Sequence, residues 1–252
     1  MNSSFYIAAV GAAAQQERMD NVANNLANIN TVGYKRMETT FGDLMKYKMS
    51  QGVEQTNVMS GTGVRVENTK TQFTQGSFVP TDNELDFVID GSGFFALQDP
   101  VTGDRTYTRA GNFEFRQFGD TYRLTSASGK LVLDADGQAI EKPVQAVGTE
   151  EDDEEPDTQE PAYTIPYNMA VYRFPVEDGL VRVGEGEYAP VAKNGQPQLD
   201  PEAHVYSGMQ EASNVELSQE MTAIIESQRA YQYALKMVQT SDEVENVINS
   251  LR

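Results

Sequence analysis

The sequence contains no cysteine, a single histidine and no apolar run that approaches the roughly 18 residues of a membrane-spanning helix. The absence of cysteine excludes disulfides, thiol catalysis and thiolate metal sites, so the fold must hold in any redox compartment. The lone histidine, His204, cannot build a histidine pair or a histidine-based catalytic triad, and we expect it in a surface loop. These absences remove several classes of enzyme and metal protein.

Positive charge is also scarce, because 19 lysines and arginines face 38 aspartates and glutamates, a formal net charge of −19. Nucleic acids and anionic membranes bind basic faces, so the composition argues against both as partners. Eight of the acidic residues lie between positions 150 and 160. This tract predicts a solvated acidic loop over 149–161, with no assigned role. No basic segment precedes the weakly apolar N-terminus, so we do not expect a cleavable secretory signal.

Proline is missing from both ends of the chain, and all ten prolines lie in its middle. This distribution predicts an α+β protein with a helix at each end and a β-rich centre. We expect residues 1–36 and 211–252 to pair as a coiled-coil-like helical domain. Residues 37–79 should form an extended connector, and residues 80–210 a central antiparallel barrel or sandwich.

The N-terminal segment, residues 5–36, predicts a helix that ends near Gly33 and keeps apolar residues three or four positions apart. This seam comprises Phe5, Ala8, Ala12, Met19, Val22, Leu26 and Ile29. The other faces carry Asn21, Asn24, Asn25 and Asn28 and few charges. Because asparagine is a poor helix former, we expect these amides to meet partner groups inside an assembly.

The C-terminal segment predicts a helix from Glu211 to the end, capped by Ser213 or Asn214 with Glu216 in capping-box spacing. One seam comprises Leu217, Met221, Ile224, Gln228, Tyr231, Leu235 and Val238. A neighbouring stripe comprises Ala230, Ala234, Met237, Val244, Ile248 and Leu251, so the apolar face can contact more than one helix. Two interpretations stay open: an ordinary helical hairpin within one chain, or helices that order on packing between subunits.

The middle of the chain alternates short apolar runs with turn residues, which predicts strands of an antiparallel fold. The expected strands cover residues 86–90, 94–97, 106–109, 113–116, 122–125, 131–133 and 163–174. Turns are expected at 91–93, 110–112, 126–129 and 136–137. The first of these reads as a hairpin that joins two neighbouring strands.

No motif in the sequence indicates catalysis. Carboxylates are so numerous that a pair at glycosidase spacing carries almost no information. The run Asp134 to Gly137 begins like a calcium loop, but its glycine is fourth rather than sixth, so we expect a hairpin turn. The G-x-G pairs at 61–63 and 91–93 lack the strand-then-helix context of a phosphate loop. We therefore expect no catalytic, cofactor or metal site and no small-molecule substrate.

Four motifs follow one another along nearly the whole chain. They are ANNLANINTVGYKR (23–36), LDFVIDGSGFFAL (85–97), YTRAGNFEF (107–115) and the terminal segment 208–251. Together they resemble the axial proteins of the bacterial flagellar rod and hook. The length and the GYKR-type start favour a rod protein over the longer hook protein. The short stretch 41–63 after the first helix and the start at Tyr6 to Ala9 slightly favour the proximal-rod over the distal-rod type.

The resemblance implies a structural protein rather than an enzyme. Members of this family are exported through the flagellar type III apparatus and polymerise with themselves and other rod and hook proteins into a helical tube. The termini form an inner coiled-coil layer, and the basal-body rod spans the periplasm and cell wall. The expected assembly interface comprises Met19, Val22, Asn24, Asn25, Leu26, Asn28, Ile29, Leu217, Met221, Ile224, Gln228, Tyr231, Leu235 and Val238.

Three alternatives remain from the sequence. The first is a hook-type axial subunit. The second is a secreted acidic carbohydrate-active enzyme, which would need a cleft with converging carboxylates. The third is an extracellular glycan-binding module on coiled-coil stalks, which would bind cell-wall glycan without its helices.

Overall fold

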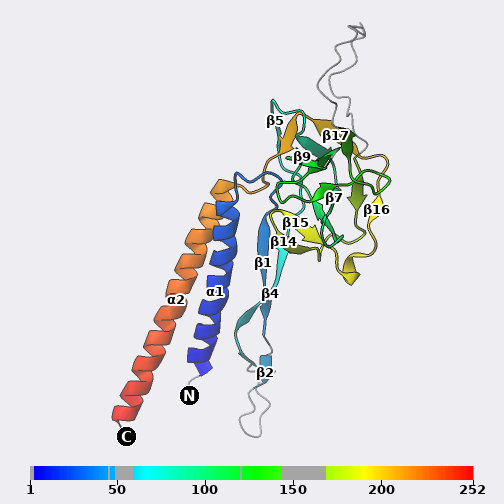
Figure 1. Cartoon of the computed structure of the whole chain (residues 1–252). Helices are drawn as coiled ribbons and strands as arrows, with labels where there is room; N and C mark the ends of the chain where they lie inside the picture. The colour runs from blue at the N-terminus through cyan, green and yellow to red at the C-terminus, as the bar shows by residue number, and fades with distance from the viewer. Residues whose placement is uncertain (1–2, 45, 49–58, 120, 144–168, 252) are drawn as a thin grey trace, which may run out of the picture. The chain divides into compact units, whose positions relative to one another are not determined.

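The fold was obtained as a computed structural model, which describes residues 3–44, 46–48, 59–119, 121–143 and 169–251 (Figure 1). The acidic tract at 149–161 and the start of the strand expected at 163–174 lie outside these residues. The chain divides into two compact units, each built from separate segments. The helical unit comprises residues 1–29, 36–72 and 215–252, and the β unit comprises residues 30–35 and 73–214.

The helical unit contains two antiparallel helices, α1 (Ser3–Ala27) and α2 (Leu217–Ser250), which lie side by side (Figure 1). Contacts at both ends fix their opposite directions, since the hydroxyls of Ser4 and Ser241 lie 3.1 Å apart and Asn25 bonds Glu220. The terminal helices and the α+β class predicted from the sequence are therefore confirmed. Within the described residues, neither helix combines the length and the apolar character that crossing a membrane would require.

A long antiparallel ribbon completes the helical unit. Its strands are β1 (Met37–Asp43), β2 (Lys46–Lys48), β3 (Met59–Gly61) and β4 (Val64–Thr71). The β1–β4 pairing runs from Met37 opposite Thr71 to Asp43 opposite Val64, with a bulge between Thr40 and Phe41. β2 pairs with β3 farther along the ribbon.

The first helix ends earlier than predicted, at Ala27 rather than near Gly33. The side-chain amide of Asn28 donates to the carbonyl of Asn24 at 2.8 Å and so satisfies an acceptor of the last helical turn. Gly33 is left-handed as predicted, with φ 65°, but it lies in the β unit and does not cap the helix.

The second helix begins later than predicted, at Leu217 rather than Glu211. Glu211 is instead the last residue of a strand. The expected capping box is wrong, because Glu216 is the N-cap and makes no side-chain cap bond. Asn214 does not cap the helix. Its side-chain amide instead donates to the hydroxyl of Thr74 at 2.9 Å.

The β unit contains the remaining strands. These are β5 (Phe78–Pro80), β6 (Phe87–Asp90), β7 (Phe94–Gln98), β8 (Arg105–Thr108), β9 (Glu114–Phe118), β10 (Thr121–Thr125), β11 (Leu131–Val132), β12 (Glu141–Pro143), β13 (Val171–Arg173), β14 (Val181–Gly184), β15 (Glu187–Ala189), β16 (Gln198–Leu199), β17 (His204–Ser207) and β18 (Met209–Glu211), with a 3-10 turn η1 (Ala192–Asn194). Ten of them form one antiparallel sheet with the path β12-β10-β11-β7-β8-β15-β14. Among the described strands this path stays open, so they do not close into a barrel.

The strand β7 is the centre of the β unit, because it is buried on both faces. Phe95 and Leu97 point into one hydrophobic cluster, and Phe94 and Ala96 point into another. This alternation follows from the two-residue period of a strand. A continuous apolar run in the sequence, FFAL, therefore marks the strand with core on both sides.

The predicted turns were confirmed where they join adjacent strands. The turn at 126–129 connects β10 to β11, and that at Asp136-Gly137 brings Leu133 opposite Ala139. The predicted hairpin around 91–93 is wrong in its pairing, because β6 pairs with β17 while β7 pairs with β8. Long-range partners thus replace the local one, which spacing in the sequence cannot reveal.

Candidate assembly surface

The N-terminal members of the expected interface lie on or just after α1, within the helical unit. Val22 and Asn25 are buried, Met19, Leu26, Asn28 and Ile29 are partly buried, and Asn24 is exposed. A single chain therefore already covers most of this set. Outside this set, the large apolar side chains that α1 leaves exposed are Phe5, Tyr6 and Val10 in its first turns.

The C-terminal members divide into two groups along α2. Ile224, Tyr231 and Val238 are partly buried, whereas Leu217, Met221, Gln228 and Leu235 are exposed. The buried positions of α2 are Glu220, Ser227 and Ser241, at spacings of seven and fourteen residues. The seam toward α1 is thus shifted by about one position from the predicted seam, and its buried members are polar, one glutamate and two serines.

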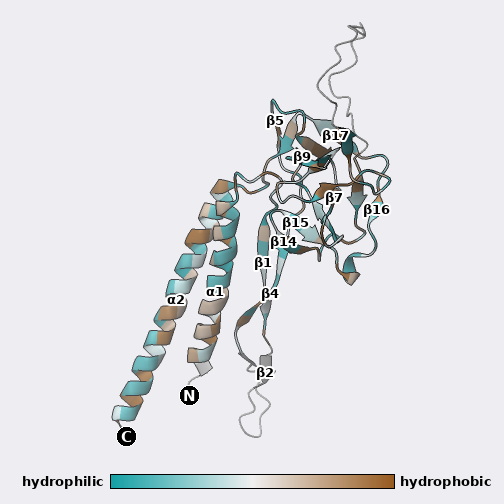
Figure 2. Ribbon diagram, viewed as in Figure 1, coloured by the Kyte–Doolittle hydropathy of each residue, from teal (hydrophilic) through white to brown (hydrophobic). Residues whose placement is uncertain are grey.

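Apolar residues recur along α2, as the brown segments of its ribbon show (Figure 2), and many of their side chains remain exposed. One stripe comprises Leu217, Met221 and Ile225, and a later one comprises Met237, Val244, Val247, Ile248 and Leu251. Met221 keeps 52% of its surface exposed and Ile248 keeps 59%. Exposed apolar patches of this kind mark surfaces that bind other proteins.

The amides of α1 find partners inside the chain. Asn21 donates to the hydroxyl of Thr39 at 2.7 Å. Asn25 pairs with the backbone of Met37 in both directions, accepting from its N–H at 2.9 Å and donating to its carbonyl at 2.8 Å. These two amides therefore hold β1 against α1. From the sequence, their partners had been expected in an assembly rather than within the same chain.

A buried carboxylate joins the same elements. Glu220 on α2 has no exposed surface, and it accepts from Asn25 at 3.2 Å and from the Nε of Arg36 at 2.5 Å. Arg36 directly precedes β1, so the cluster connects both helices and the ribbon. A separate ion pair joins the two helices directly. The Nη2 of Arg18 lies 3.5 Å from the Oε2 of Glu226, and both side chains are more exposed than Glu220.

Sequence reasoning missed Glu220, because it looked for apolar seams. A signal was nevertheless available in the row of positions seven residues apart on α2. That row reads Glu220, Ser227, Ala234 and Ser241. A single charge among small residues at heptad spacing is typical of a buried polar group in a helix seam.

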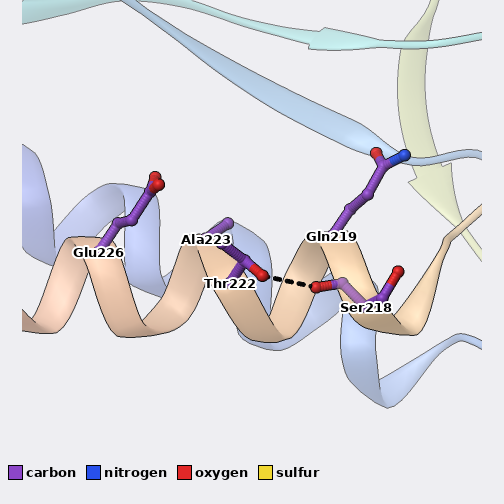
Figure 3. Close-up of a pocket in the computed structure, with 5 residues that line it drawn as sticks. All are labelled: Ser218, Gln219, Thr222, Ala223 and Glu226. Atoms are coloured by element: carbon purple, nitrogen blue, oxygen red, sulfur yellow. Dashed lines mark hydrogen bonds between the residues drawn. The ribbon is translucent and has the colours of Figure 1, made fainter.

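An open hollow on α2 is lined by one helix only (Figure 3). Its residues are Ser218, Gln219, Thr222, Ala223 and Glu226, and Thr222 donates to the carbonyl of Ser218 at 2.9 Å. The side chains stand on successive turns and do not converge on a common point. Such an open hollow, lined from one side only, lacks the enclosure of a small-molecule site. Among the described residues, no group of three or more carboxylate or imidazole side chains could hold a metal ion.

A second buried ion pair lies in the β unit, at the GYKR motif. The Nζ of Lys35 is 2.6 Å from a carboxylate oxygen of Glu211 and donates to the carbonyl of Thr74 at 2.8 Å. Arg109 lies 3.5 Å from the other oxygen of Glu211. Burial lowers the pKa of both Lys35 and Arg109, and the charge of Glu211 opposes that shift. This network fastens residues 30–35 into the β unit.

Comparison with known proteins assigns the chain's family. The model "Flagella basal body rod protein" matches residues 5–35, "Flagellar hook protein FlgE/F/G D1 domain" matches residues 88–173, and "Flagellar basal body rod FlgEFG protein C-terminal" matches residues 206–251. The flagellar basal-body rod protein FlgG of Buchnera aphidicola subsp. Schizaphis graminum is 32% identical over the full length of both chains. The chain belongs to the flagellar basal-body rod protein family.

Further relatives agree with this membership. FlgG of Bacillus subtilis is 31% identical over 97% of both chains, and the rod protein FlgF of Mesorhizobium japonicum is 30% identical over 100% of this chain and 98% of its own. Flagellar rod proteins are structural subunits of the basal body, so the prediction of a non-enzymatic protein of the basal-body rod is confirmed. The slight preference for the proximal-rod type stays a prediction.

Proposed function

We propose that this rod protein polymerises helically through its terminal helices, which pair as a coiled coil and pack against those of neighbouring subunits. The observation that supports this is the apolar stripe of Leu217, Met221 and Ile225, which remains exposed although it borders the seam with α1. Fully burying a side chain of this size contributes roughly 1.5–3 kcal/mol. Because these side chains are about half exposed, a substantial part of this stabilisation is gained only when a neighbouring subunit covers them.

We expect each segment of the chain to have its own role in the assembled rod. The helices within the terminal segments 1–36 and 211–252 supply the assembly surface, the ribbon within 37–79 packs against α1, and the sandwich-like region 80–210 lies outside the tube. The expected interface adds the partly buried Met19 and Leu26 and the buried Val22 to the stripe. The assembled rod, together with other rod and hook proteins, would transmit torque from the motor to the hook.

Export through the flagellar type III apparatus is the proposed route to the rod. The chain contains no cysteine, so no disulfide has to be reduced before it is threaded as an unfolded polypeptide.

Replacing Met221 by glutamate tests the proposed surface. Because Met221 is half exposed, the Met221→Glu chain should keep its melting temperature within a few degrees, yet fail to build rods in cells without the wild-type chain. Thr222→Glu is the matched control, since it adds the same charge one residue along, about 100° around the helix. Electron microscopy of isolated basal bodies provides the measurement.

Normal rods and hooks in the Met221→Glu strain would contradict the proposed surface. Deletion of the gene with normal basal bodies, or normal incorporation of chains lacking 1–35 or 215–252, would contradict the rod assignment itself. If the chain were a hook-type subunit, deletion of its gene would leave the rods intact and remove the hook. A glycan-binding module would bind cell-wall glycan without its helices.

A further inference from the structure

The seam between α1 and α2 is poor in features that could select one register. Its α2 side includes the partly buried Ile224, Tyr231 and Val238 and a row of small residues at heptad spacing, Ser227, Ala234 and Ser241. A slide of α2 by seven residues would place one small side chain of this row at a site that already accepts another. The packing of this row therefore distinguishes weakly between neighbouring registers.

Glu220 is the exception in this row. It is fully buried and charged, and its two oxygens accept from Asn25 on α1 and from Arg36 beside β1. Asn25 is itself fixed by its two bonds to the backbone of Met37. All of these groups belong to the helical unit, and each has its partner in one register only.

We propose that Glu220, with Asn25 and Arg36, is a register lock that positions α2 against α1 and β1. A slide of one heptad moves Glu220 by about 10 Å and leaves a buried carboxylate without its cation. Removing one partner of a buried charge pair is far more costly than replacing both partners by apolar groups. The lock therefore penalises wrong registers strongly and adds little to the right one.

The consequence for assembly rests on the proposed function. The apolar stripe that begins at Leu217 and Met221 lies on the same helix as the lock. A slide of α2 would carry this stripe along the subunit and out of step with its neighbours. Glu220, Asn25 and Arg36 are thus positioning residues for the assembly surface, without touching a neighbouring subunit themselves.

The absence of cysteine makes the register directly measurable. The hydroxyls of Ser4 and Ser241 lie 3.1 Å apart, so Ser4→Cys with Ser241→Cys should form a disulfide in the native register. Ser4→Cys paired with Ala234→Cys or with Ile248→Cys reports a slide of seven residues in either direction. Each pair is the only thiol pair in its purified full-length chain.

In the otherwise unchanged chain, the native pair should cross-link roughly a hundredfold more than the two slid pairs. In the Glu220→Met chain, and in Glu220→Met with Arg36→Met, which leaves no unpaired charge, slid and native pairs should cross-link to similar extents. Far-ultraviolet circular dichroism should show unchanged helix content in both. Glu220→Gln, which keeps an acceptor oxygen, should restore the preference for the native pair.

The matched control is Glu226→Met, which removes the exposed ion pair with Arg18 between the same two helices and should leave the native preference intact. Exclusive native cross-linking in the Glu220→Met chain would overturn the proposal. So would absence of the native cross-link in the unchanged chain, or loss of helix in the double variant. These readouts need no rod, so they separate failure of the lock from failure of the proposed function, which Met221→Glu tests.

Discussion

At the scale of single residues, Gly33 illustrates how a correct local prediction can have a different cause. The sequence suggested a left-handed glycine that stops a helix. The residue is left-handed, but a Cβ atom at this position would lie 2.6 Å from the backbone nitrogen of Ala110. Its N–H also donates to the carbonyl of Glu211 at 2.8 Å. The glycine is required by close backbone approach within the β unit, which only the fold reveals.

Tyr188 is a buried residue whose hydroxyl makes the β unit sensitive to alkali. Its ring packs edge-on against Phe73 and Phe94, and its hydroxyl has no hydrogen-bond partner among the described residues. Burial raises its pKa to about 12 from an ordinary value of 10.0. Between these values the unfolded chain releases the proton while the folded chain keeps it, so stability falls as pH rises.

We expect Tyr188→Phe to remove this loss, which amounts to about 2 kcal/mol at pH 11.5 and reaches about 3 kcal/mol, the full value for a shift of two pKa units, only above the folded pKa. Urea unfolding followed by circular dichroism at pH 8 and pH 11.5 measures it as a pH dependence of the free energy of unfolding. The variant should match or exceed the wild type at pH 8, because no hydrogen bond is lost. Equal slopes with pH in the two proteins would contradict the expectation.

At the scale of elements, the helices were predictable in place and the seam between them was not. Apolar periodicity located both helices, because a stripe every three or four residues survives any tertiary context. It could not decide which stripe meets α1, because the exposed stripe with Met221 is more apolar than the buried row with Ser227. The chain buries the smaller side chains, which allow the helices to approach each other closely.

Ser227→Leu tests this reading of the seam. Ser227 is fully buried, and its hydroxyl donates to the carbonyl of Ala223 at 2.8 Å. A leucine there should overpack the seam and lower the free energy of unfolding of the helical unit by about 1–3 kcal/mol. The control is Gln232→Leu, which adds the same side chain at an exposed position of α2. Thermal unfolding followed at the helix band provides the comparison, and an unchanged Ser227→Leu protein would place the seam elsewhere.

Local sequence patterns predicted where the strands of the β unit lie, but not which strands pair with each other. Turn residues predicted the β10–β11 hairpin because its two strands bond directly. They failed for β6, whose partner β17 lies more than a hundred residues away. The sequence from Asp86 to Asp90 does not indicate whether its partner strand is local or distant, since either strand would form the same backbone hydrogen bonds.

At the scale of the whole molecule, the boundary between the units falls inside the GYKR motif. Tyr34 and Lys35 belong to the β unit, whereas Arg36 belongs to the helical unit. Lys35 is fully buried against Glu211, and the guanidinium of Arg182 lies 4.2 Å from the ring centre of Tyr34. The predicted division at residue 36 would therefore remove part of the β unit's own interior.

A pair of fragments measures this contribution. We expect residues 30–214 to unfold with a free energy about 3–5 kcal/mol greater than residues 36–214, because the shorter fragment leaves Glu211 buried without Lys35. Urea unfolding followed by circular dichroism gives both values. Both fragments carry 36–72 equally, so that segment cancels in the comparison. Identical midpoints would mean that residues 30–35 add nothing to the β unit.

The bond between Asn25 and Glu220 joins residues that lie 195 positions apart in the chain. A ribosome adding about 5–20 residues each second needs roughly 10–40 s to travel from one to the other. For that whole interval α1 exists without the helix that covers it. The helical unit can close only when synthesis is nearly complete, so a prematurely terminated chain cannot offer the finished surface to a growing rod.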